Sequence, residues 1–445
     1  MGTRLILSVG LAVFALSSVQ AADLITLDQA VRYGLDHNFA LQTTSERARA
    51  AHARVGMAKS GRLPQLDASY LVRRSNNPLD AFADKLNTRS VNPATDFTAE
   101  ALNHPSASTL HASELALQLP IYTGGRLSAA IRRARDDEHA ADFGVDYARQ
   151  QTIFGIIRAY LAAQAAIYGE QIANDAVSAA QEHADTTARL VREGRIVVSD
   201  RMTAELNLAA TQSAREKAIN REQRSLDQLK LAMGMPMDQD VQIASWQEAV
   251  AAPIDPLPVI EQRALTNRQD LQAARSLTSA GQAGVREARA ALKPQFSVVA
   301  KSDWYDDHFG FANNSQSIMG IVSMNLYRGG HDSSELAAAR YQANEAQLQA
   351  SSLEQEIRDE VRTAYFNVQE AEARRAIAAK NVSKARATVD LVKQRYGEGR
   401  TILLDVLMSE RLLVEARNEK LASSLELATS EAQLEMAEGT LTAPN

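Results

Sequence analysis

The sequence predicts a mainly α-helical protein with a small β-sheet contribution, built from two copies of one unit. Three observations lead to this prediction: an internal repeat, two very long helical stretches rich in Ala, Glu and Arg, and four short segments of alternating polarity. The repeat organises the chain of 445 residues, because each copy contains one long helical stretch and two of the short segments.

The repeat is clearest where LYRGG at Leu326–Gly330 echoes IYTGG at Ile121–Gly125. A shift of 205 residues aligns 122–234 with the second half without a gap, and the preceding parts match at a shift of 230. The difference of 25 residues predicts a longer loop in the first copy, between Pro64 and Tyr122. The chain is therefore divided into a first repeat at 22–234, a linker at 235–256, a second repeat at 257–439 and a C-terminal tail at 440–445.

Each copy is predicted to contain one long helix flanked by two shorter ones. The long stretch at 126–191 would extend about 100 Å as a helix, and its copy lies at 331–396. The shorter stretches, at 27–62 and 200–233 in the first copy, have together nearly the same length. Two helices stacked end to end would therefore match one long antiparallel partner, which favours a tube or a rod over a globular domain. A solitary rod-like coiled coil stays open as an alternative.

The boundaries of these helices are marked by proline and glycine. Pro64 and Pro294 end the first helix of each copy, because proline does not continue a helix comfortably. Gly234 and Gly439 follow the last helix of each copy, where a glycine C-cap is expected.

The short alternating segments have the length of membrane-crossing β-strands. They include 65–77 and 295–305, and the stretches leading to Ile121 and Leu326; a tilted strand needs about 9–11 residues to cross a bilayer. In a membrane, four strands in an open sheet would leave edge N–H and C=O groups unsatisfied, so the sheet would have to close. Two chains would supply 8 strands, three 12 and four 16, while a soluble hairpin packed on the helices is the alternative.

The glycine pairs are interpreted as hinges between strand and helix. Gly124 and Gly125 in the first copy, and Gly329 and Gly330 in the second, follow the alternating segments and precede the long helices. Glycine tolerates backbone angles that a side chain forbids, which suits such a sharp change of direction. In this interpretation Leu326 is the last lipid-facing residue and Tyr327 lies at the membrane boundary.

Composition indicates export and excludes several classes of function. Residues 1–21 contain one Arg, a short apolar run and small residues before Ala21, as a secretory signal peptide does. The chain has no cysteine, and its net charge of −6 offers no basic surface for nucleic acid. The eight histidines are scattered, and neither an HExxH motif nor a phosphate-binding loop is present. We therefore expect no enzyme activity, no metal site and no cofactor.

The duplicated layout resembles the TolC family of outer-membrane efflux proteins. The resemblance rests on PIYTGG and NLYRGG, on the two Gly-Arg turns with Asp six residues after the glycine, and on YGEGRTILLDVL at Tyr396–Leu407. It implies a homotrimer with a 12-stranded barrel in the lipid of the outer membrane and an α-helical tunnel in the periplasm. The linker and the tail would form an equatorial zone near the middle of the tunnel.

The resemblance also implies partners and a function. The family serves multidrug efflux pumps and type I secretion systems as a passive duct, together with a periplasmic adaptor and an inner-membrane pump of the RND, ABC or MFS type. A soluble periplasmic coiled-coil adaptor or scaffold is the alternative from another class, although the β-rich modules that adaptors need are not visible in the sequence.

The family pattern assigns roles to residues at the closed tip of the tunnel. Asp405 matches an acidic ring across the entrance, Met408 would add an apolar constriction, and Asp200 and Tyr396 match a hydrogen bond that holds the tip shut. The tip residues Gly194, Arg195, Gly399 and Arg400 would contact the adaptor. The simpler alternative is that Asp200 and Asp405 are helix N-caps and that the glycines only permit the turns.

Overall fold

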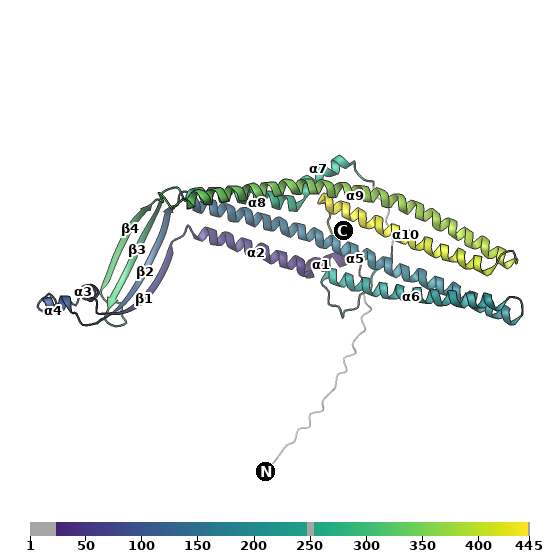
Figure 1. The fold of residues 1–445 in the computed structure, drawn as a ribbon, viewed down its shortest axis with the longest axis horizontal. Coiled ribbons are helices and arrows are strands. Elements are labelled where there is room, and N and C mark those ends of the chain that lie inside the picture. Colours follow the sequence, from purple (N-terminus) through teal and green to yellow (C-terminus); the bar gives the residue numbers. More distant parts are fainter. Residues whose placement is uncertain (1–23, 247–252, 444–445) are drawn as a thin grey trace, which may run out of the picture.

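The computed structural model describes residues 24–246 and 253–443. The predicted signal peptide at 1–21 lies outside these described residues. The molecule is long, with a β-sheet at one end and helical hairpins that run from the sheet to two turns at the opposite end (Figure 1). Among the described helices, none combines the length and apolar character required to cross a membrane.

The first half of the chain contains eight elements: α1 (Leu27–His37), α2 (Phe39–Ser60), β1 (Gln65–Ser75), α3 (Pro78–Asn87), α4 (Ala99–Asn103), β2 (Ser108–Tyr122), α5 (Arg126–Arg192) and α6 (Val198–Met233). The second half contains α7 (Leu257–Asn267), α8 (Gln269–Ala290), β3 (Gln295–Asp306), β4 (Asn314–Ser323), α9 (His331–Gly397) and α10 (Leu403–Glu438). The duplication is therefore visible in the fold. The longer loop predicted in the first half contains α3 and α4, which have no counterpart in the second half.

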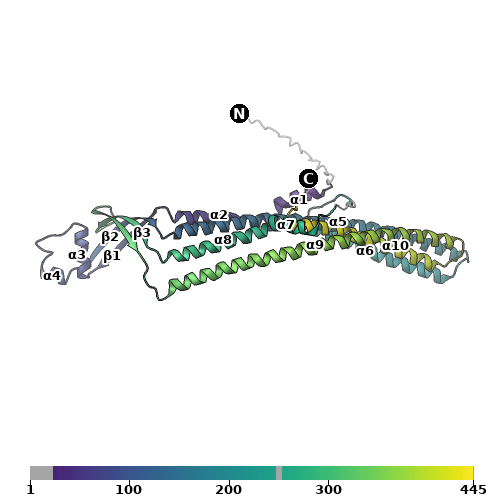
Figure 2. The ribbon, with the colours of Figure 1, turned by 90° about the horizontal axis from the view of Figure 1, so that it is seen from above.

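The long helices α5 and α9 have 67 residues each, as the repeat predicts. Helices α2 and α6 follow each other along α5, and α8 and α10 do the same along α9 (Figures 1 and 2). Because α8 and α10 also pack against α5, the helices form one curved wall. The wall ends at α2 and α6 on one side and at α9 on the other.

Both predicted first helices are interrupted, which corrects the sequence prediction. The stretch at 27–62 breaks at Asn38, whose side chain accepts from Leu41 N and donates to Ala232 O. The stretch at 257–292 breaks at Arg268, which is buried and pairs with Asp270 and Glu360 at 2.6 Å each. Each break receives the end of another helix, because Gly234 after α6 lies against His37, and Gly439 after α10 lies against Asn267.

The strands form one antiparallel sheet in the order β1-β2-β3-β4. Its register aligns Ser69 with Glu114 and Glu114 with Asp303, and therefore gathers polar side chains on one face. Leu66, Leu117 and Ile318 belong to the opposite face, which is mostly apolar along the middle of the strands. Strand β4 ends at Ser323, three residues before Leu326. The predicted strand leading to Leu326 is therefore too long, and Leu326 lies outside it.

The four hinge glycines all adopt positive φ angles. The values are 63° at Gly124, 95° at Gly125, 61° at Gly329 and 84° at Gly330, a region that favours glycine. Gly125 and Gly330 are the N-caps of α5 and α9. The backbone thus turns from sheet to helix at these two pairs, although their role as hinges between membrane and tunnel stays a prediction.

The main hydrophobic cores lie around the middle of the helical wall. In one of them Val31, Ile156, Leu229 and Met233 are fully buried, and partly buried residues near both ends of the first half pack around them. Near the start of the described residues, Ile25 forms a bridge with Ile243 of the linker. The part of the linker around Ile243 therefore packs at the middle of the molecule, while the proposed domain boundaries stay a prediction.

A comparison of two glycines with positive φ, Gly234 and Gly194, tests this packing directly. Gly234→Ala would place a Cβ 2.4 Å from the carbonyl oxygen of His37, in addition to the strain of a positive φ of 73°. Gly194→Ala has the same type of strain, at a φ of 68°, but open space around it. We expect Gly194→Ala to cost about 1 kcal/mol and Gly234→Ala roughly 1–3 kcal/mol more. Thermal unfolding in detergent measures the difference, and equal losses would contradict the contact.

Candidate functional site at the hairpin turns

The two turns at the far end of the helices have the same backbone geometry. After α5, the N–H of Arg195 donates to Leu190 O at 2.9 Å, and after α9 the N–H of Arg400 donates to Arg395 O at 2.8 Å. Gly194 and Gly399 have φ angles of 68° and 70° and open space around them. This is the glycine-dependent way of ending a helix, so the backbone conformation alone accounts for both glycines.

The arginines of the turns pair locally. Arg195 contacts Glu193 at 3.5 Å, and Arg400 contacts Glu398 at 3.0 Å. Both pairs are exposed, and exposed ion pairs contribute little to stability. The turn arginines therefore remain accessible to another molecule.

The prediction that Asp200 and Asp405 are N-caps is wrong. The N-caps of α6 and α10 are Val197 and Ile402, and each aspartate lies three residues further, in the first helical turn. A carboxylate there still interacts favourably with the helix dipole. Asp405 accepts a hydrogen bond from the hydroxyl of Thr401.

Asp405 and Met408 lie one turn apart on the exposed side of α10. Met408 is 57% exposed, whereas Val406 and Leu407 between them are buried. Neither exposed side chain is thus needed for the packing of the single chain.

Tyr396 and Asp200 come close together across the two hairpins. Tyr396 packs on a cluster formed by Ala184, Ala204, Leu403 and Leu407. Burial raises the pKa of Tyr396, and the negative charge of Asp200 raises it further. Within the described part of the chain, however, no hydrogen bond joins the two side chains.

A three-helix ion cluster near the turns was not predicted from the sequence. His183 of α5 contacts both carboxylate oxygens of Glu410 of α10 at 3.0 Å, and Lys393 of α9 contacts the same carboxylate at 2.7 Å. Burial raises the pKa of Glu410, but the hydrogen bonds from His183 and Lys393 outweigh it and hold that pKa below its ordinary value. The internal repeat did not indicate this cluster, because Glu205, which takes the place of Glu410 in the first copy, pairs with Arg201 on its own helix.

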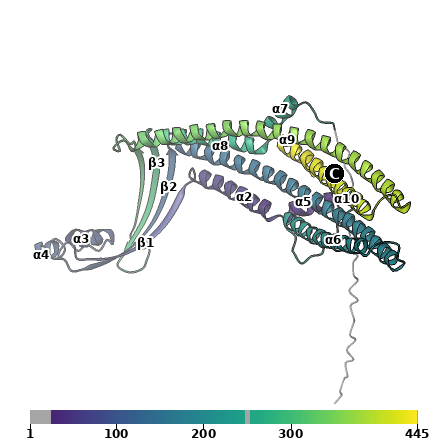
Figure 3. The same cartoon turned by 45° about the vertical axis from the view of Figure 1, so that its right-hand side comes forward.

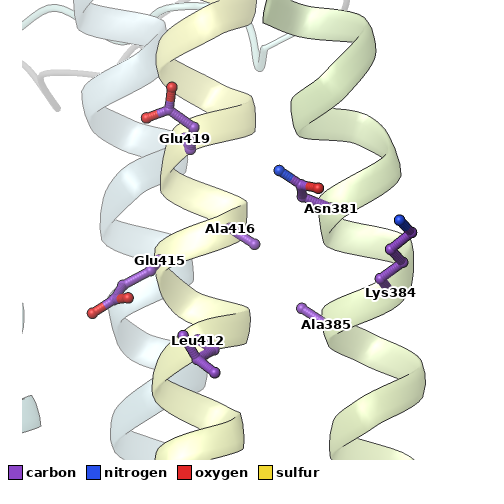
Figure 4. A pocket seen from close by; sticks show the side chains of 7 residues that line it. All are labelled: Asn381, Lys384, Ala385, Leu412, Glu415, Ala416 and Glu419. Carbon is purple, nitrogen blue, oxygen red and sulfur yellow. The ribbon is translucent and has the colours of Figure 1, made fainter.

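A groove of about 470 Å³ lies between α9 and α10, further from the turns than this cluster. In Figure 4, Ala385 and Ala416 extend into the gap between the helices. Asn381, Lys384, Glu415 and Glu419 contribute polar groups to its lining. Small residues here leave room between the helices.

Two groups in the described residues hold ligand atoms within 4.8 Å of one another: Asp306, Asp307 and His308, and His331, Asp332 and Glu335. The carboxylates already have partners in the chain. His308 contacts Asp306 and Asp307, and Asp332 pairs with Arg328.

A family model described as "Outer membrane efflux protein" matches residues 32–235 and 260–440, which is most of the chain. The solvent efflux pump outer membrane protein SrpC of Pseudomonas putida is 28% identical over 186 residues, and the toluene efflux pump outer membrane protein TtgI of the same species is equally similar. Each alignment covers 39% of this chain and 38% of the relative, so the chain matches well under half of either relative's length.

Solved structures of outer-membrane channels have the same fold over nearly the whole chain. The channel OprN is 19% identical, with a TM-score of 0.79 and coverage of 94% of this chain and 91% of its own. The CmeC channel of Campylobacter jejuni is 17% identical, with a TM-score of 0.78 and coverage of 93% and 85%. The open state of MtrE of Neisseria gonorrhoeae is 17% identical, with a TM-score of 0.76 and coverage of 94% and 91%. The predicted fold class is confirmed.

The ion cluster near the turns makes a testable contribution. Glu410→Gln removes a mostly buried charge partner, which costs about 1–3 kcal/mol, and should speed amide exchange near the turns roughly 5- to 150-fold. Because the pKa of Glu410 is lowered in the fold, this contribution is present above the unfolded pKa of about 4.3 and is lost as pH falls through the folded value.

Glu415→Gln is the matched control, because Glu415 forms only an exposed pair with Arg411 on the same helix. Hydrogen exchange with mass spectrometry measures both variants. If the amides near the turns were equally protected from exchange in Glu410→Gln and in the unmodified protein, the ion cluster would not hold the two hairpins together.

Proposed function

The chain belongs to the outer membrane efflux protein family, and we propose from this premise that it is the outer-membrane duct of a multi-component exporter. The observation that supports the proposal is a helical wall that continues from a membrane-length sheet to turns at the far end (Figure 1). The duct serves an efflux pump or a type I secretion system, catalyses no reaction and needs no cofactor.

The two free edges of the chain support closure with further copies. Among the described strands, β1 and β4 each pair with one strand only, and the helical wall ends at α2 and α6 on the side of β1 and at α9 on the side of β4. Lipid cannot satisfy the free backbone groups of a strand edge. Ile318 of β4 is 80% exposed, as suits a side chain that faces lipid. We propose a homotrimer, in which twelve strands form the barrel and the helices form the tunnel.

The duplication supplies the geometry of this closure. Within the chain, α5 packs against α8, and Arg133 and Glu287 approach to 3.8 Å. In the internal repeat α9 is the counterpart of α5, and α8 is the counterpart of α2. The contact of α5 with α8 should therefore recur between α9 of one copy and α2 of the next. At that contact Ala338 takes the place of Arg133 and Met57 takes the place of Glu287, and Met57 is 72% exposed in the single chain.

The turns support the gate and docking roles implied by the family resemblance. Three exposed Asp405 carboxylates would surround the entrance near the axis, where they attract cations and repel anions. Met408 narrows the same opening, while Tyr396 and Asp200 keep the hairpins together in the closed state. The accessible Gly194, Arg195, Gly399 and Arg400 form the surface for a periplasmic adaptor, which opens the tip.

The inner-membrane partner is a pump of the RND, ABC or MFS type. The curated relatives are named for the efflux of solvent and toluene, and small apolar molecules are accordingly the cargo that we propose first. The alternative of a soluble adaptor has no support, because the described residues contain no globular β-rich module beside the hairpins.

Crosslinking tests the duct directly, since the chain has no cysteine of its own. A variant with both Ala338→Cys and Met57→Cys, isolated in the outer-membrane fraction, should form covalent dimers and trimers with a short bismaleimide. Each single variant is the matched control and should give no trimer. Recovery of the protein as a soluble periplasmic monomer would overturn the proposed function.

The acidic ring predicts an effect on ions. Asp405→Asn removes three charges at the entrance, so block of the reconstituted pore by divalent or trivalent cations should weaken at least several-fold. Glu415→Gln is the control, because Glu415 is an exposed carboxylate on the same helix that pairs with Arg411 and has no part in the gate. Planar-bilayer recording measures block and selectivity, and unchanged values in Asp405→Asn would reject the ring.

A further inference from the structure

The first half of the chain carries an ordered insertion that the second half lacks. Residues 76–107 join β1 to β2, whereas only residues 307–313 join β3 to β4. Helix α3 in this insertion is well capped, because Asn77 accepts a hydrogen bond from Leu79 N at 2.9 Å and Pro78 occupies the first turn. The insertion is therefore a folded unit at the outer end of the sheet (Figure 3).

Ion pairs fix α3 to the polar face of the sheet. Arg73 contacts Asp84 at 2.5 Å, and the hydroxyl of Ser108 donates to the same carboxylate at 2.8 Å. In the strand register Arg73 and Ser108 lie on the face that carries Ser69 and Glu114. Asp84 is only 3% exposed, so removing it from these partners would leave a buried charge unpaired.

The insertion extends across the width of the sheet. Beyond α3, Arg89 donates to the carbonyl oxygen of Asn314 at the start of β4, at 3.0 Å. Lys85 contacts Asp96 at 2.5 Å, and Asp96 also accepts from the N–H of Asn92, which holds the following segment against α3. The insertion thus connects the strands at both edges of one sheet.

The far side of α3 is apolar and has no partner in the described part of the chain. Leu79 is 77% exposed and Leu86 is 53% exposed. They lie two turns apart, on the side of the helix opposite the buried Ala81 and Asp84. Because the buried side of α3 faces the polar surface of the sheet, these leucines point away from the wall.

We propose that residues 76–107 form an outer lid, in which the α3 helices of three copies meet over the mouth of the barrel. This inference rests on the proposed function, since the polar face of the sheet is the lumen only in a closed barrel. Twelve strands spaced by about 4.8 Å and tilted by about 40° close into a wall roughly 24 Å across. Three helices about 10 Å wide on the inner side of that wall contact one another near the axis.

The lid adds a second barrier at the end opposite the turns. Leu79 and Leu86 of three copies form a small apolar contact that releases water when it closes. The buried pairing of Asp84 with Arg73 keeps each α3 attached to its own wall. Bulky molecules outside the cell are thereby kept out of the lumen, while export displaces the lid from within.

A single cysteine tests the contact between copies. Leu79→Cys in the full chain, in intact outer membranes, should form covalent dimers on mild oxidation. Phe309→Cys is the matched control, because Phe309 is also exposed, at 67%, but lies in the turn between β3 and β4, and this variant should form no covalent dimer. Absence of dimers in Leu79→Cys, or equal dimer formation in the control, would overturn the lid.

A graft tests the barrier itself. Ser69→Cys places a thiol on the lumen face, and its labelling from outside by a bulky maleimide should become at least tenfold faster when residues 76–107 are replaced by the sequence of 307–313. An unchanged rate would contradict the lid. Crosslinking between positions 338 and 57 distinguishes a failure of the lid from a failure of the proposed function. If that crosslink does not form, the proposed duct is wrong; if it forms and the labelling rate is unchanged, only the lid is wrong.

Discussion

The backbone groups along the free edges of β1 and β4 impose the requirement on which the rest of the structure depends. A four-stranded sheet leaves two rows of N–H and C=O groups unpaired, and in lipid each group costs several kcal/mol. One chain cannot close such a short sheet on itself. The helical wall has its own edges at the same two sides, at α2 and α6 and at α9, so the proposed pairing between copies would complete the barrel and the tunnel together.

The glycines between sheet and helix indicate where that pairing occurs. A Cβ at Gly124 would lie 2.7 Å from Lys293 Cβ and 2.9 Å from Ala290 O, because the first hinge packs against the end of α8. Around Gly329 the same space is open. The repeat assigns this space to the end of α2 in another copy, at the positions of Ser60 and Leu63. Gly124 is thus enclosed within the chain, whereas in the proposed trimer α2 of another copy would enclose Gly329.

Much of this architecture could be predicted from the sequence, because periodicity and chain punctuation act locally. The lengths of α5 and α9, the hinge glycines and the C-caps at Gly234 and Gly439 all follow from such signals. The breaks at Asn38 and Arg268 could not be predicted, since both depend on partners far along the chain. The contact of His183 with Glu410 joins residues 227 positions apart for the same reason.

The two halves differ at both ends of the molecule. In the proposed trimer each half presents the same faces along the wall, because the contacts within a chain would recur between chains. At the turns, Glu410 joins three helices, whereas Glu205 pairs only within α6. At the outer end of the sheet, only the first half carries α3 and α4. The proposed closure would therefore constrain the middle of both repeats and leave the two ends, where a duct would meet its partners and the exterior, free to differ.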